Sequence, residues 1–193
     1  MLSSLTRHKL PYVVAAIACL LGLSVVASAS AQSGGTSSTG GAAFVPPPPP
    51  PKKAKIVNGR AIAPRGAPKR VKRVIAAGNK LIGKPYRYGG GHRAFSSRLD
   101  SGYDCSGTVS YALYGGRFLR SPLPSGALMD WGRSGPGRWI TVYAHGGHAY
   151  LVVAGLRLDT GMRDPDAPTT SGPAWSKKLR RSSSFTARHP SRY

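Results

Sequence analysis

Apolar residues between positions 68 and 82 recur at the spacing of an α-helix, with basic residues on the opposite side. The apolar positions are Val71, Val74, Ile75, Leu81 and Ile82, and the basic ones are Lys69, Arg70, Lys72 and Arg73. Pro68 suits the first position of a helix, and Gly83 and Pro85 are expected to end it. The pattern therefore predicts one amphipathic helix at the start of a globular part that runs from 68 to 193.

A second helix is expected to begin at Asp104 or Cys105. Four of its residues would share one face: Cys105, Val109, Ala112 and Leu113. Gly115-Gly116 would stop it, and Asp104 stands where an N-cap residue would.

Strand patterns follow the two helices. Residues 139–143 are β-prone, residues 149–154 form a nearly unbroken apolar run, and residues 156–160 alternate. A turn at Ala154-Gly155-Leu156 would pair the last two as a hairpin, and residues 185–189 fit a last edge strand. Residues 122–137 and 165–184 contain loop-forming and polar residues, so no element is assigned there. Helices followed by an antiparallel sheet predict an α+β fold.

The first 31 residues have the layout of a secretory signal peptide. Arg7 and Lys9 precede a charge-free apolar run at residues 10–26, and small residues suited to cleavage follow at 27–31. The run is at the lower limit of what spans a bilayer, so an uncleaved membrane anchor is the alternative. We expect an exported protein, located in the periplasm, the cell wall or outside the cell.

Residues 32–67 are expected to form a linker. The segment is rich in Ser and Gly, contains six consecutive prolines at 46–51, and then becomes basic. Such a proline run favours a stiff polyproline II rod. Residues 52–98 hold fourteen Lys and Arg and no acidic residue, within a chain of net charge +22. This charge attracts polyanions, and behind an export signal we expect anionic envelope polymer or peptidoglycan rather than nucleic acid. A solvated basic linker without specific contacts is the alternative.

Cysteine usage singles out one residue. Cleavage of the signal would remove Cys19 and leave Cys105 as the only thiol. Cys105 lies at an expected helix N-terminus, where the helix dipole and first-turn N–H groups lower a thiol pKa and favour the nucleophilic thiolate. Ser106 and Gly107 are small, so a substrate could approach the backbone there. A small buried hydrophobic cysteine is the alternative interpretation.

A cysteine nucleophile needs a base, and His148 is the best placed of the histidines. It follows Gly146-Gly147 and opens the most apolar strand, which would hold its ring rigidly. Asp159, on the next strand of the hairpin, would lie near the His148 end and could orient the imidazole. His145 and His148 could instead share a metal ion, but no third ligand has a fitting spacing, so we expect neither metal nor cofactor. His92 and His189 could line a site but lack a comparable scaffold.

Three motifs resemble the NlpC/P60 family of cell-wall cysteine peptidases. They read Tyr86-Arg87-Tyr88-Gly89-Gly90, then Asp104-Cys105-Ser106-Gly107, then Gly147-His148, in the family's order. The resemblance implies a papain-like fold with Cys105 as nucleophile, His148 as base, and Tyr86 helping to bind the substrate or the oxyanion. Ser106 is expected beside it from its position, since backbone N–H groups at the helix start could form part of an oxyanion hole. It also implies hydrolysis of amide bonds in peptidoglycan stem peptides, commonly between D-γ-glutamate and a diamino acid.

Two departures from the family pattern concern spacing and the third polar residue. Tyr86 and Cys105 are 19 residues apart, so residues 92–101 look like an inserted loop. The family's third polar residue is usually His, whereas Asp159 is assigned here from strand geometry. The alternatives are a non-catalytic wall-binding protein and a related thiol amidase or acyltransferase. We expect a monomer, close to the membrane if the N-terminal segment is retained.

Overall fold

Both helices that the apolar spacing predicts are present. The computed structural model describes residues 51–96, 98–161 and 172–193. The helices are α1 (Lys69–Leu81), α2 (Cys105–Gly115) and the short α3 (Ser125–Leu128). The strands are β1 (Lys55–Val57), β2 (Arg60–Ile62), β3 (Arg133–Ser134), β4 (Ile140–His145), β5 (His148–Val153), β6 (Leu156–Asp159), β7 (Ala174–Ser176) and β8 (Thr186–His189). Pro68 is the N-cap of α1 rather than its first residue, and Ile82 is its C-cap.

Six strands form one antiparallel sheet in the order β3-β8-β4-β5-β6-β7. The turn between β5 and β6 lies where the sequence predicts it. Ala154 and Gly155 have φ values of 46° and 78°, the left-handed conformations that a two-residue hairpin turn requires. This register pairs Leu151 with Leu158 and brings Asp159 to the level of Tyr150, two residues from His148. The predicted α+β class is confirmed.

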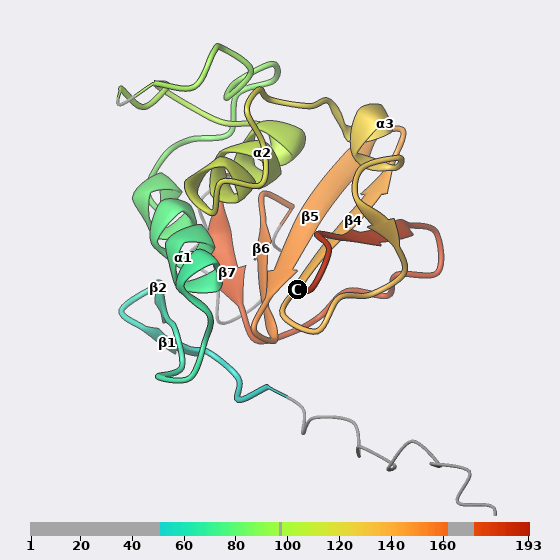
Figure 1. The fold of residues 1–193 in the computed structure, drawn as a ribbon. Helices are drawn as coiled ribbons and strands as arrows, with labels where there is room; N and C mark the ends of the chain where they lie inside the picture. Colours follow the sequence, from blue (N-terminus) through green and yellow to red (C-terminus); the bar gives the residue numbers. More distant parts are fainter. Residues whose placement is uncertain (1–50, 97, 162–171) are drawn as a thin grey trace, which may run out of the picture. The chain divides into compact units, whose positions relative to one another are not determined.

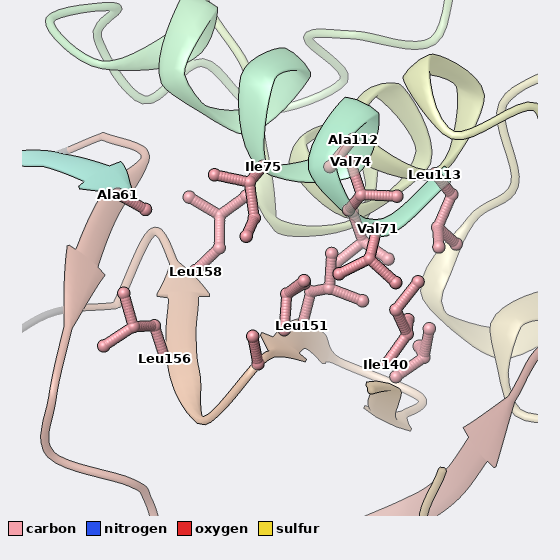
Figure 2. Packing of buried hydrophobic residues seen from close by; sticks show 14 of the residues in the cluster. Ala61, Val71, Val74, Ile75, Ala112, Leu113, Ile140, Leu151, Leu156 and Leu158 are labelled. Carbon is pink, nitrogen blue, oxygen red and sulfur yellow. The ribbon is translucent and has the colours of Figure 1, made fainter. Parts of the chain in front are cut away.

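Helices α1 and α2 lie side by side on one face of this sheet (Figure 1). Figure 2 shows Val71 and Val74 of α1 directed toward Leu151 and Ile140 of the sheet. These residues are fully buried, as are Leu113 of α2 and Leu158 of β6. Since each buried side chain of this size contributes about 1.5–3 kcal/mol, this layer holds α2 firmly against β5 and β6.

Part of the expected linker belongs to the packed structure. Residues 55–62 form the hairpin β1–β2, whose turn is Asn58-Gly59 with φ values of 48° and 73°. Asn-Gly between two short apolar stretches is a strong hairpin signal. The side chain of Asn79 in α1 accepts from the N–H of Ala61 and donates to its carbonyl, each at 2.9 Å. Ala61 is buried, so the hairpin is fixed to α1.

The C-terminal strands differ from expectation in two respects. β8 forms at nearly the predicted residues, but it lies between β3 and β4 and is therefore not an edge strand. β7 forms inside the segment to which no element was assigned, because Trp175 is buried and its Nε1 donates to Asn79 Oδ1 at 2.9 Å. Tertiary packing, rather than a local pattern, stabilises this strand.

None of the helices in the described ranges has the length and apolar character that a membrane span requires. The expected signal peptide at 1–31, including the alternative membrane anchor at 10–26, lies outside the described residues, as does most of the expected linker.

Candidate active site

Cys105 is the first residue of α2, directly after its N-cap. Asp104 Oδ1 accepts from the N–H of Gly107 at 2.7 Å, which is the capping interaction that the sequence predicts. Asp104 is buried, and its other oxygen accepts from the N–H of Gly89 at 3.1 Å. The cap therefore fixes the helix start and ties the glycine turn of residues 89–91 to it.

The thiol of Cys105 is half-buried and ionises more readily than an ordinary cysteine. Burial by itself raises the pKa of the thiol. Hydrogen bonds from His148 and from the backbone of Ala149, together with the charge of His148, outweigh this effect and lower the pKa below its ordinary 9.0. The geometry thus favours a thiolate beside an imidazolium.

His148 is the first residue of β5, and it contacts Asp159 across the hairpin. Its Nε2 lies 2.9 Å from Asp159 Oδ1, and its side chain is 19% exposed. Burial lowers the pKa of His148, but the hydrogen bonds to Asp159 and Cys105 and their negative charges raise it to about 9. Because Asp159 engages Nε2, Nδ1 is the ring nitrogen left to face the thiol.

Asp159 ends β6 and is 1% exposed. Its Oδ1 also accepts from the N–H of Gly161 at 3.0 Å, and its Oδ2 accepts from Arg180 Nη1 at 3.1 Å. Arg157 Nε lies 3.5 Å from the same Oδ2. Burial raises the pKa of Asp159, but its bonds to His148, Gly161 and Arg180 lower it to about 2, so the carboxylate is ionised.

The longer spacing between Tyr86 and Cys105 does not separate them. Tyr86 and Tyr103 form an isolated parallel bridge, so residue 86 runs beside the residues that lead into α2. Burial raises the pKa of Tyr86, and the negative charge of Cys105 raises it further, which reflects their proximity. The phenol is partly exposed and lines the same cleft as Cys105.

Ser106 lies beside His92, one of the two histidines that were expected only to line a site. Its hydroxyl is 3.2 Å from Asp104 Oδ1 and 3.1 Å from His92 Nε2, and His92 Nε2 is itself 3.1 Å from Asp104 Oδ1. His92 therefore belongs to the wall of the site. Its glycine-rich surroundings gave no periodic signal, and it lies two residues beyond the first motif, which ends at Gly90.

These side chains border one open cleft of about 490 Å³. Its lining includes Tyr86, Tyr88, His92, Cys105, Ser106, Ser125 and the turn glycines Gly146 and Gly147. Two of the five predicted site residues lie deeper: His148 and Asp159 stand behind the thiol. His145, the other histidine considered for a metal site, uses its Nδ1 to accept from the N–H of Gly147. In the described part of the chain, no set of three His, Cys, Asp or Glu side chains is grouped so that it could hold a metal ion.

The arrangement has the parts of a nucleophilic site: an ionisable thiol at a helix N-terminus, an imidazole beside it, and a buried carboxylate behind the imidazole. The sequence identified these three residues. It did not identify Arg180, which belongs to a basic run of residues 177–181 that resembles a solvated surface segment.

Comparison with solved structures finds Rv1477, a hypothetical invasion protein of Mycobacterium tuberculosis, at 23% identity and a TM-score of 0.44, covering 72% of this chain and 69% of that one. Two structures of the Resuscitation Promoting Factor Interacting protein RipA, each mutated at one residue, match at 23% and 22% identity with the same coverage and TM-score. No protein-family model and no curated protein matches the chain. We therefore base the function on the residues and geometry described above.

Proposed function

We propose that this protein is an exported cysteine peptidase of the NlpC/P60 type that hydrolyses amide bonds in peptidoglycan stem peptides. The observation that carries the proposal is the linked set of Cys105, His148 and Asp159, in which His148 Nε2 lies 2.9 Å from Asp159 Oδ1 and the thiol pKa is lowered by His148. The three ordered sequence motifs support the family. By that resemblance, the bond between D-γ-glutamate and a diamino acid is the expected point of cleavage.

The catalytic steps follow from the chemistry of these groups. The Cys105 thiolate attacks the scissile carbonyl, and the first-turn N–H of Cys105 and the Tyr86 hydroxyl are the proposed donors to the resulting oxyanion. His148 donates its proton to the leaving amine as the thioester forms. Water, deprotonated by His148, then attacks the thioester, which releases the acyl group as a carboxylic acid and restores the thiolate beside protonated His148. Asp159 holds the imidazole in the orientation that both proton transfers need.

The cleft has room for a peptide-like substrate. Gly89, Gly146 and Gly147 border it without side chains that would keep a substrate backbone away. The basic stretch of residues 52–98 would keep the protein close to anionic envelope polymers. The apolar run at 10–26 and the small residues that follow support export, and in this proposal the protein acts as a monomer.

The test compares the purified protein with its Cys105→Ala variant on insoluble peptidoglycan, with mass spectrometry of the soluble products. We expect the wild type to release stem-peptide fragments, and the summed mass of the products to exceed that of the uncleaved peptide by one water per cleaved bond. The variant should release none. Release by Cys105→Ala at the wild-type rate would refute a thiol mechanism. Products that carry an added acceptor would indicate acyl transfer, and retention on the wall without release by either protein would indicate a binding role.

A further inference from the structure

We propose that Arg180 is a positioning residue for the proposed reaction: it holds the Asp159 carboxylate in place and adjusts how strongly His148 keeps its proton. The inference rests on the proposed function for its catalytic consequence. Its structural part concerns contacts that exist whatever the substrate is.

Arg180 and His148 contact different oxygens of the Asp159 carboxylate. His148 Nε2 lies 2.9 Å from Oδ1, whereas Arg180 Nη1 lies 3.1 Å from Oδ2. Gly161 N–H adds a bond to Oδ1. A carboxylate bound through both oxygens cannot rotate, so Oδ1 stays aligned with the imidazole. Bonds to a charged donor contribute more than neutral ones, which makes Arg180 the strongest anchor of Oδ2 alongside Arg157.

The same guanidinium also contacts the imidazole. Arg180 Nη1 lies 3.1 Å from His148 Nε2. When Nε2 donates to Asp159, the arginine cannot donate to that nitrogen, and when Nδ1 is protonated as well the contact is one between two cations. A like charge at this distance disfavours the imidazolium. Arg180 thus opposes the effect of Asp159 and keeps the pKa of His148 lower than the carboxylate alone would set it.

Arg180 is itself held in place. Its guanidinium lies 5.8 Å from the ring centroid of Tyr150 and 5.7 Å from that of Phe185. A Cβ at Gly161 would lie 3.2 Å from its Nη1, so a larger residue there would crowd it. With a side chain 34% exposed, Arg180 covers the imidazole–carboxylate pair on one side. These contacts distinguish it from its neighbour Arg181, which is exposed.

The charged and titratable groups around His148 come from every element near it. They are Cys105 of α2, Tyr150 of β5, His145 of β4, Arg157 and Asp159 of β6, and Arg180 of the segment after β7. Arg180 is the cation in direct contact with the ring. Its removal is therefore expected to strengthen proton retention by His148. Since a general acid works best when its pKa is near the working pH, an imidazole that holds its proton more tightly transfers it less readily to the leaving amine.

The test uses three variants of the whole protein: Arg180→Gln, Arg180→Lys and, as a control of equal charge, Arg181→Gln. Two properties are measured across pH 5–11: kcat and KM on a soluble stem-peptide fragment, and the rate at which iodoacetamide alkylates Cys105, followed by mass spectrometry of the Cys105 peptide. The alkylation needs no substrate, so it tests the inference even if the protein does not cleave peptidoglycan.

For Arg180→Gln we expect two features to move upward by about 0.5–1 pH unit. They are the alkaline limb of kcat and the alkaline step in the alkylation rate at which His148 loses its proton. We also expect kcat to fall roughly tenfold, with KM little changed, because Asp159 is less well held. Arg180→Lys should keep the limb near its wild-type position, since the charge remains, and should recover part of kcat. Arg181→Gln should match the wild type in both.

The inference would be overturned if the alkaline limb of kcat in Arg180→Gln stayed at its wild-type pH. It would also be overturned if Arg181→Gln moved that limb by as much as Arg180→Gln does. If Arg180→Gln does not fold, Arg180→Lys decides: wild-type kcat in that variant would overturn the positioning role. A wild-type protein that shows the alkaline step in alkylation, shifted in Arg180→Gln, but cleaves no peptidoglycan would refute the proposed function and leave the inference standing.

Discussion

Replacing Asp159 by Asn tests the buried charge cluster behind the thiol. The change keeps the shape of the side chain but removes the charge shared by His148, Arg180 and Arg157. The amide offers one acceptor oxygen instead of two, and its NH₂ group would face a cation. Removing one partner from a buried ionic cluster costs about 3–5 kcal/mol, because the remaining buried charges lose the carboxylate that they faced. Arg157, at 4% exposed, is the more deeply buried of the two arginines that face this carboxylate.

The measurement is urea unfolding at pH 6, where Asp159 is ionised, with Asp130→Asn as the matched control. Asp130 also faces an arginine, Arg188, at 3.5 Å, but its side chain is 90% exposed. An exposed pair contributes below about 1 kcal/mol, so the control should unfold nearly as the wild type does. If Asp159→Asn lowers the free energy of unfolding by no more than Asp130→Asn does, the view that the cluster is desolvated and coupled is refuted.

The difference between wild type and Asp159→Asn should also depend on pH in a defined direction. The pKa of Asp159 is lowered in the folded protein to about 2, from an ordinary 3.8. The stability that its charge contributes is therefore fully present above pH 3.8 and is lost as the pH falls through 2. The difference in the free energy of unfolding between wild type and Asp159→Asn should stay constant from pH 6 to about 4 and become smaller below that pH.

Three further changes have outcomes that the structure predicts. His148→Ala should slow iodoacetamide alkylation of Cys105 at pH 6 by at least about tenfold, because the thiol pKa rises when the imidazole is lost; an unchanged rate would contradict the pairing. Asp104→Ala should lower the free energy of unfolding by about 1–2 kcal/mol through loss of the N-cap, as measured by denaturant unfolding. Gly78→Ala should destabilise by about 1–3 kcal/mol, because the new Cβ would lie 2.7 Å from Trp175 Cζ2. A stabilised Gly78→Ala would show that helix propensity, about 1 kcal/mol in favour of Ala, decides there instead.

The parts of the fold that the sequence predicts are those with a local signal. The spacing of Val71, Val74 and Ile75 reports one buried helix face, and Gly155 marks the turn that sets the register of Asp159. Because that register follows from a single turn, the proximity of His148 and Asp159 could be anticipated without the structure. The capping role of Asp104 was equally local.

The parts that could not be predicted depend on contacts between distant segments. β7 forms because Trp175 packs in the core and bonds to Asn79, which is 96 residues away. Arg180 reaches Asp159 only because β7 leads the chain back beside β6. No pattern within residues 177–181 distinguishes Arg180 from Arg181. Only the hairpin β1–β2 had a local signal, Asn58-Gly59, and it was obscured by the basic composition around it.

The attachment of that hairpin defines the minimal folding unit. A fragment trimmed to the start of α1 would lose the backbone groups of Ala61 that satisfy the Asn79 amide, together with the bond from Ala54 N–H to the carbonyl of Ala154 at the β5–β6 turn. The same amide accepts from the Trp175 indole, so removing the hairpin would also weaken a contact of β7 at the edge of the sheet. Recombinant fragments should therefore keep Ala54 and the hairpin that follows it.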